Sequence, residues 1–271
     1  MALDERRLTP NLGIARMNQT NSMTRTRERG HIHEMGAVRS AVRELQRRSV
    51  QVFALPGLVR LSLVGRPAKR YSIVEIGVFK GDTAVLLIQL IGGHGVEVHY
   101  VGFDLFENQE EFFLQHPEDR KWYDHPDYPY WEFESGDHAF SRVFAKITSI
   151  LPKPRFTLVS GDSTQTVRTN QALIGHADLV YIDGCHDYEI VRKDWENVIH
   201  LFEDNPSLIV AFDDATYLGV SQLRGEIQRE CTSLRVLHLN FNQFYVCSLR
   251  MPLGLRVMLE TLSFLARSLR R

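Results

Sequence analysis

Short apolar runs alternate with segments of helical spacing from residue 71 to residue 249, and this alternation restricts the fold most strongly. Strands that are separated by helices form a parallel sheet covered on both faces. We therefore predict an α/β fold: a doubly wound sheet of seven mostly parallel strands, with an antiparallel C-terminal strand after a tight Asn-rich turn. The expected strands are 71–76, 96–104, 156–159, 177–183, 207–212, 234–240 and 244–249.

The composition is typical of a globular protein that does not span a membrane. Hydrophobic residues make up 44% and charged residues 24%, and the formal net charge of -1 gives no overall attraction to nucleic acid. No apolar stretch of about 18 residues occurs, and the N-terminus lacks the apolar core of a secretion signal. The three cysteines, Cys185, Cys231 and Cys247, form no CxxC pair. We expect a cytoplasmic protein without disulfides.

Three regions differ in composition along the chain. Residues 1–34 are polar, and we expect a mobile N-terminal arm there. Residues 35–250 contain the alternating strands and helices of the main domain. Residues 251–271 have the spacing of an amphipathic helix with a basic end, which can pack on the domain or on a second subunit, or lie on a membrane surface or a partner.

The connection between the second and third expected strands is unusually long, at about 50 residues. Its central part, at about 107–140, is rich in aromatic and acidic residues, and Pro117, Pro126 and Pro129 exclude a single regular helix. A long insertion at the ligand end of a sheet is often a lid or a substrate wall. The alternative is an insertion without a catalytic role, or one that forms a homo-oligomer contact.

Every expected parallel strand has an acidic residue near its carboxyl end. In an open parallel sheet the carboxyl ends of the strands meet at one edge, where ligands bind. Several acids buried at one edge are costly unless they have partners, so this coincidence indicates a functional site. The acids are Glu75, Asp104, Asp162, Asp183, Asp213 and Asp214.

The turn after the first strand has the pattern E-x-G-x-x-x-G, formed by Glu75, Gly77 and Gly81. It differs from the dinucleotide pattern G-x-G-x-x-G, and any tight strand-to-helix turn also uses glycine. Asp104 ends the second strand, where a carboxylate can accept both hydroxyls of a ribose. Taken alone, Asp104 could simply cap a helix. The turn and Asp104 together favour an adenosine-containing ligand.

Five motifs resemble those of the class I methyltransferases that use S-adenosylmethionine (SAM), over about residues 71–217. Within that class they are most similar to the macrolide sugar O-methyltransferases of the TylF and MycE type, which implies a Rossmann-like fold. The segment 203–207 (EDNPS) departs from the Pro-Gly-Gly turn usual in these proteins. The motifs are VEIGVFKGDTAVLL, VGFDLFE, LVSGDS, DLVYIDGCHDYEIVRKDWENV and LIVAFDDAT.

The resemblance implies roles for the residues at matching positions. Glu75, Gly77 and Gly81 would line the methionine portion of SAM, and Asp183 would lie beside it. Asp104 would hold the ribose hydroxyls. Asp162 and Ser163 would lie near the adenine.

Asp183, Asp213 and Asp214 supply hard oxygen ligands, which suit Mg²⁺ or another divalent cation. Related metal-dependent O-methyltransferases use acids at the ends of the same two strands. A bound cation lowers the pKa of an acceptor hydroxyl. The alternative is that Asp214 only caps the next helix.

His186 follows Asp183 by three residues, and we expect both side chains to act in catalysis. Catechol-type O-methyltransferases have a catalytic lysine at the corresponding place, whereas the sugar-modifying branch has histidine. An imidazole is a suitable general base near neutral pH. The alternative is a surface histidine or one that orients a metal ligand.

These observations predict a SAM-dependent O-methyltransferase that acts on a small hydroxylated molecule, such as a sugar-bearing natural product. One alternative is a relative of the same fold with hydroxylase activity. Another is a non-catalytic SAM-binding or assembly protein, although such a protein need not keep the acidic triplet and His186. Nucleic-acid modification is disfavoured because no basic groove or N/D-P-P-Y/F motif is present.

Overall fold

The computed structural model describes residues 70–115, 139–238, 242–254, 256–257 and 259–261. All of these residues belong to the compact unit Phe53–Arg271. The predicted N-terminal arm, the centre of the insertion and the last part of the C-terminal helix lie outside the described residues.

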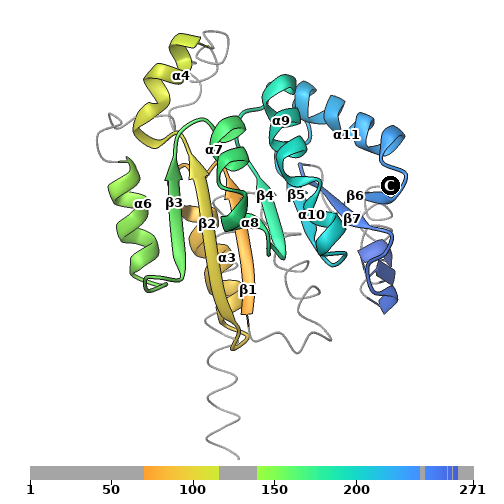
Figure 1. Cartoon of the computed structure of the whole chain (residues 1–271), viewed down its shortest axis with the longest axis horizontal. Coiled ribbons are helices and arrows are strands. Elements are labelled where there is room, and N and C mark those ends of the chain that lie inside the picture. Colours follow the sequence, from red (N-terminus) through yellow and green to blue (C-terminus); the bar gives the residue numbers. More distant parts are fainter. Residues whose placement is uncertain (1–69, 116–138, 239–241, 255, 258, 262–271) are drawn as a thin grey trace, which may run out of the picture. The chain divides into compact units, whose positions relative to one another are not determined.

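Seven strands form one sheet in the order β3-β2-β1-β4-β5-β7-β6 (Figure 1). The first five strands pair in parallel, and β7 pairs antiparallel with both β5 and β6. The predicted fold class is therefore confirmed. Because β7 lies between β5 and β6, the edge strands of the sheet are β3 and β6. The strands are β1 Arg70–Ile76, β2 Glu97–Asp104, β3 Phe156–Ser160, β4 Leu179–Ile182, β5 Ile209–Phe212, β6 Leu234–His238 and β7 Phe244–Ser248.

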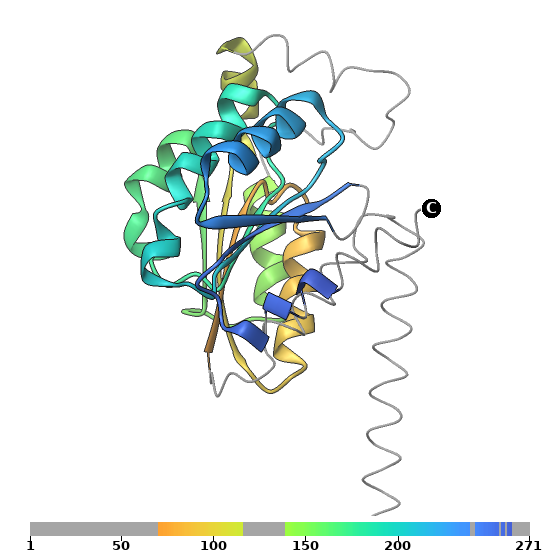
Figure 2. The same cartoon turned by 90° about the vertical axis from the view of Figure 1, so that its right-hand side faces the viewer.

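Helices cover both faces of the sheet, and Figure 2 shows the two layers on opposite sides. Successive strand residues point to opposite faces, so Ile73 packs in one apolar cluster and Val74 in the other. The first cluster includes residues of α3 and α6, and the second includes residues of α7 to α11. The helices are α3 Asp82–Gly92, the 3₁₀ turn η2 Phe106–Asn108, α4 Gln109–Gln115, α6 Ala139–Thr148, α7 Ser163–Thr169, α8 Gln171–Ile174, α9 Tyr188–Val198, α10 Leu201–Asp204 and α11 Leu218–Glu230.

The direction of winding reverses between β1 and β4. From β1 the chain proceeds to β2 and β3 on one side, and it then returns to β4 and β5 on the other. Ile76 of β1 is level with Ile182 of β4, which is level with Phe212 of β5. Asp183 after β4 and Asp213 after β5 therefore emerge beside each other, next to Gly77 after β1. This is the switch point where ligands of doubly wound sheets bind.

Two outer regions are described in part. The connection between β2 and β3 begins with η2 and α4 and ends with α6. After β7, residues 253–254, 256–257 and 259–261 are helical, and Met251 and Leu259 are buried in the first cluster. Among the described residues, no helix is both long and apolar enough to cross a membrane.

Candidate functional site

The turn between β1 and α3 depends on two glycines with positive φ, Gly77 at 87° and Gly81 at 73°. A Cβ atom on Gly77 would lie 2.2 Å from the carbonyl oxygen of Asp183, and one on Gly81 would lie 3.2 Å from Val143 Cγ1. Only glycine avoids both the strain and the clash at Gly77. The structure therefore places the turn directly against the β4 loop, and this contact within the chain is an immediate reason for the glycine pattern.

Asp104 lies at the end of β2 and reaches back to the same turn. Its Oδ2 accepts hydrogen bonds from the backbone N–H groups of Val78 and Phe79, both at 2.8 Å, and its Oδ1 accepts one from Phe106 at 2.8 Å. Burial raises the pKa of Asp104, and these backbone hydrogen bonds oppose the shift. A carboxylate has about four acceptor positions, and backbone N–H groups already use most of those of Asp104, so a ligand hydroxyl would share them with the turn.

Glu75, the last acid of β1, is fully buried. Its Oε2 accepts a 2.5 Å hydrogen bond from the Tyr100 hydroxyl, whereas its Oε1 has no hydrogen-bond partner among the described residues. Burial raises the pKa of Glu75 to about 8, against the opposing effect of Tyr100. A buried oxygen without a partner is costly, so Oε1 is suited to a cationic or N–H donor from a ligand.

Asp162 and Ser163 stand where β3 meets α7. The Asp162 carboxylate caps α7, because it accepts hydrogen bonds from the backbone N–H and the hydroxyl of Thr164, both at 2.9 Å. Ser163 lies near Asp194, a fully buried acid of α9 whose carboxylate oxygens have no hydrogen-bond partner of good geometry among the described residues. Burial raises the pKa of Asp194 to about 7, and the contact with Ser163 opposes this shift. The predicted adenine contacts of Asp162 and Ser163 stay predictions.

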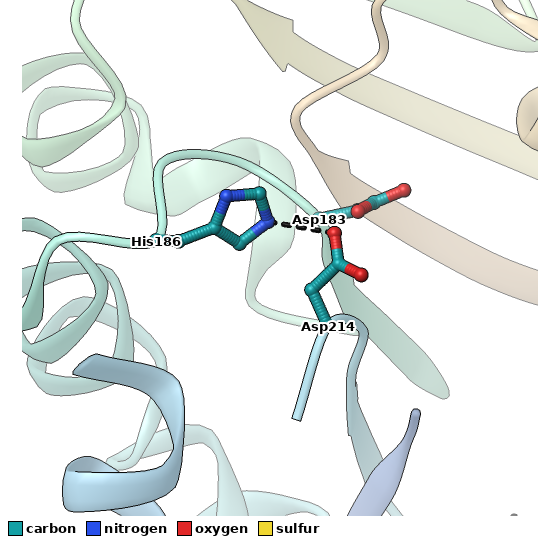
Figure 3. Close-up of side chains that lie close together, drawn as sticks. All are labelled: Asp183, His186 and Asp214. Atoms are coloured by element: carbon teal, nitrogen blue, oxygen red, sulfur yellow. Dashed lines mark ion pairs between the residues drawn. The ribbon is translucent and has the colours of Figure 1, made fainter. Parts of the chain in front are cut away.

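Asp183, His186 and Asp214 converge at the ends of β4 and β5, as Figure 3 shows. One ligand atom from each side chain lies within 4.8 Å of the other two. His186 Nε2 is 2.7 Å from Asp214 Oδ2, and the imidazole ring stacks on Tyr217 with 4.2 Å between ring centroids. The loop between β4 and α9 and the loop between β5 and α11 therefore assemble a carboxylate and imidazole cluster.

The pKa values of the two carboxylates in this cluster are shifted in opposite directions. Burial raises the pKa of Asp183 well above its usual range, and the nearby charges of Asp213 and Asp214 raise it further. Burial also acts to raise the pKa of Asp214, but the contacts with His186 and Asn242 outweigh it and lower the pKa overall. The cluster thus brings together carboxylates whose negative charges oppose one another, and a bound cation would compensate them.

Asp213 is held outside the cluster. Its Oδ2 accepts a hydrogen bond from the Tyr181 hydroxyl, and its Oδ1 accepts from the Asp214 backbone N–H at 2.8 Å and from Asn242 Nδ2 at 3.1 Å. The gathered ligand atoms are therefore those of Asp183, His186 and Asp214, whereas the sequence indicated Asp183, Asp213 and Asp214. A metal role for Asp213 stays a prediction.

Three further residues of the site are not indicated by the sequence motifs. Asn242 donates to both Asp213 and Asp214, but it comes from the Asn-rich segment before β7, for which the sequence predicts only a turn. Tyr217 stacks on His186. Gly219 brings α11 against the His186 loop, because a Cβ there would lie 2.3 Å from the His186 carbonyl oxygen. Tyr217 and Gly219 come just after the paired acids in sequence, and this proximity is the signal that could mark them as part of the site.

The fold and the site together define a class of protein. It is a doubly wound α/β domain in which a glycine turn faces a cluster of acids and one histidine at the switch point, the place where sheets of this kind bind ligands. Residues 74–215, just over half of the chain, match the model of the Methyltransf_24 family, described as a methyltransferase domain. The chain belongs to this family, which confirms the methyltransferase prediction.

Several solved methyltransferase structures are similar to the chain at low sequence identity. The calicheamicin methyltransferase CalS11 is 19% identical, with 72% of this chain and 77% of that chain covered and a TM-score of 0.47. An O-methyltransferase from Bacillus cereus is 13% identical, with 71% and 80% covered and a TM-score of 0.46. The O-methyltransferase TomG from Streptomyces achromogenes is 13% identical, with 71% and 79% covered and a TM-score of 0.45. No curated protein matches the chain.

Proposed function

We propose that this chain is a SAM-dependent O-methyltransferase that acts on a hydroxyl group of a small molecule. The observation that carries the proposal is the convergence of Asp183, His186 and Asp214 at the switch point, in a chain of a methyltransferase family. A sugar-bearing natural product is the acceptor class that the sequence resemblance favours. The cluster supplies a base and carboxylates next to the turn that would hold the cofactor, which is what methylation of a hydroxyl requires.

The residues around the glycine turn fit SAM. The buried Glu75 Oε1, without a partner among the described residues, can accept a hydrogen bond from the ammonium group of the methionine portion. Asp104 keeps the turn in place and would accept from the ribose. When bound, SAM supplies an electrophilic methyl group. The remaining contacts in the proposal come from Gly77, Gly81, Asp162, Ser163 and Asp183.

The cluster also fits a divalent cation such as Mg²⁺. Asp183 and Asp214 belong both to the triplet expected from the sequence and to the group that the structure brings together, so they form the centre of the proposed metal site. Asp213 would have to exchange its hydrogen bond from Tyr181 for the cation. The chemistry that such an ion supplies is a lower pKa for the acceptor hydroxyl.

His186 is the proposed general base. Its ring stacks on Tyr217, and its Nε2 is 2.7 Å from Asp214 Oδ2, so the Asp214 carboxylate would stabilise the imidazolium. In the proposed reaction the acceptor oxygen forms a bond to the methyl carbon, the bond from that carbon to sulfur breaks, and His186 takes the hydroxyl proton. Positioning of the oxygen in line with the methyl group supplies much of the rate.

SAM binding to the full chain, measured by calorimetry, tests the cofactor assignment. Asp104→Ala removes both the clamp on the glycine turn and the ribose acceptor, so we expect a loss of affinity of at least about tenfold, which is about 1.4 kcal/mol. Asp178→Ala is the matched control, because Asp178 also accepts from a backbone N–H, that of Ser72 at 2.9 Å, at the opposite edge of the sheet. Equal SAM affinity in wild type and Asp104→Ala would reject the assigned role.

Methyl transfer from labelled SAM to a panel of hydroxylated small molecules tests the chemistry. We expect EDTA to suppress transfer and Mg²⁺ to restore it. His186→Ala should lower turnover by about 10²–10⁴-fold, the usual contribution of a general base, with little change in SAM affinity. Full activity after rigorous removal of metal would exclude the metal, and a variant that lost SAM affinity but kept turnover would exclude His186 as the base.

A further inference from the structure

Asn242 lies between the two adjacent acids that follow β5. Its Nδ2 donates to Asp214 Oδ1 at 2.8 Å and to Asp213 Oδ1 at 3.1 Å. Its Oδ1 accepts from the Thr216 hydroxyl at 3.2 Å, and its backbone carbonyl accepts from the Ala215 N–H at 2.7 Å. One residue from the segment before β7 thus contacts all four residues of the 213–216 turn.

The orientation of the Asn242 amide follows from its partners. Ionised carboxylates only accept hydrogen bonds, so the NH₂ end must face Asp213 and Asp214, and the carbonyl end is left for the Thr216 hydroxyl. Because Asn242 holds Oδ1 of Asp214, the other oxygen, Oδ2, faces His186 Nε2 at 2.7 Å. The same amide lies between two like charges that would otherwise separate the carboxylates.

Asp214 has an unfavourable backbone conformation, with φ at 51° in a residue other than glycine. Such a conformation persists only where surrounding contacts determine it. Asn242 supplies two of these contacts, through the Asp214 side chain and through the N–H of Ala215, which follows it. The position of Asp214 therefore depends on a residue that is 28 positions away in the sequence.

We infer that Asn242 is a positioning residue that directs Asp214 toward His186 and so prepares the cluster for a divalent cation. The inference rests on the proposed function and extends it to the strand on the far side of β5. Asn242 itself would touch neither cofactor nor acceptor. Residues that orient metal ligands in this way typically change metal affinity or activity by about 10–100-fold when replaced.

Titration with Mn²⁺, followed by electron paramagnetic resonance of the unbound ion, tests this without knowledge of the acceptor. In SAM-saturated full-length protein, Asn242→Ala should raise the Mn²⁺ dissociation constant about 10–100-fold and leave the SAM dissociation constant within twofold. Asn205→Ala is the matched control. Its side chain also bridges a turn, donating to the Ala177 carbonyl at 2.8 Å and accepting from the Ser207 N–H at 3.0 Å, but at the opposite edge of the sheet.

The outcomes separate this inference from the proposed function. Loss of Mn²⁺ affinity in Asn242→Ala alone supports the inference, and equal loss in Asn205→Ala, or none in either variant, overturns it. If the wild type binds SAM but no Mn²⁺, the proposed metal site is rejected. Crystal structures of the wild type and the Asn242 variants then test whether Asn242 orients Asp214. Asn242→Asp keeps the volume and the acceptor for Thr216 but removes both donated hydrogen bonds, so Asp214 should turn away from His186. An unchanged Asp214 orientation in both Asn242 variants would overturn the inference.

Discussion

Carboxylates in similar sequence positions have different surroundings in this protein. Asp213 and Asp214 are neighbours in sequence, yet Asp213 is bound by Tyr181 and Asp214 faces His186. Asp104 holds a backbone turn, and Asp162 caps a helix. The partners of each carboxylate, more than its place at a strand end, therefore determine what it can do.

Asp194 provides a test of burial at the residue scale. Burial raises its pKa from 3.8 to about 7, so between these pH values the folded state holds a proton that the unfolded state has released. Its contribution to stability is therefore present below about pH 4 and is lost as the pH rises to about 7. Asp194→Asn cannot ionise, so we expect the variant to gain stability relative to wild type across this window, by about 2–4 kcal/mol at pH 8.

Chemical denaturation at intervals from pH 4 to pH 8 measures this difference. Glu75→Gln should behave in the same direction over a wider window, because burial raises the pKa of Glu75 from 4.5 to about 8. If the free energy of unfolding changes with pH in the same way for wild type and Asp194→Asn, ionisation of the Asp194 carboxyl does not destabilise the folded state as expected. The experiment needs neither cofactor nor acceptor, so it tests the buried charge alone.

At the scale of elements, two loops and one helix form the cluster. Asp187 begins α9 by accepting from the Glu189 N–H at 2.9 Å, and this cap shapes the turn that carries His186. Gly219, near the start of α11, lets that helix pack against the same turn. The β4 and β5 strands are only four residues each and are fully buried, so the loops after them begin from a rigid base.

Two glycines of α11 should respond in opposite ways to alanine. Gly219→Ala places a Cβ 2.3 Å from the His186 carbonyl, so we expect a loss of about 1–3 kcal/mol in stability and a displaced His186. Gly225→Ala meets only the flexible end of Arg229 at 3.3 Å, and it should stabilise the helix by about 0.5–1 kcal/mol. Thermal unfolding and methyl transfer of both variants check this, and equal activity and stability in the two would contradict the packing argument.

At the scale of the whole molecule, the switch point connects separate parts of the sheet. The residues proposed to bind SAM lie at or just after the carboxyl ends of β1, β2, β3 and β4, and the proposed metal site adds β5. A ligand at this edge would therefore contact both halves of the sheet and stabilise the folded chain by linkage. The two apolar clusters on the opposite faces support the edge without contributing to its chemistry.

Thermal unfolding in the presence of SAM measures this linkage. At a SAM concentration 100 times its dissociation constant, we expect about 2.7 kcal/mol of stabilisation, which raises Tm by roughly 5–10 °C for a domain of this size. Asp104→Ala at the same SAM concentration should show about half of that rise if its affinity is tenfold lower. An unchanged wild-type Tm at saturating SAM would contradict the cofactor assignment.

Much of the fold was predictable from the sequence because its signals are local. Strand and helix periodicity indicated the sheet, its direction and its covering on both faces. The acids at strand ends indicated the functional edge, since parallel strands bring their carboxyl ends together whatever the details of packing. The motifs also indicated the methyltransferase family, which the match over residues 74–215 confirms.

Only the tertiary structure decided which side chains meet. The insertion of β7 between β5 and β6 brings Asn242 to Asp213 and Asp214, and no periodicity in the chain indicates a contact over that separation. In the same way, Tyr181 engages Asp213, which leaves His186 as the third member of the cluster with Asp183 and Asp214. Sequence therefore determined which groups stand at the edge, whereas packing between distant segments determined their partners, because hydrogen bonds and burial depend on distances in space.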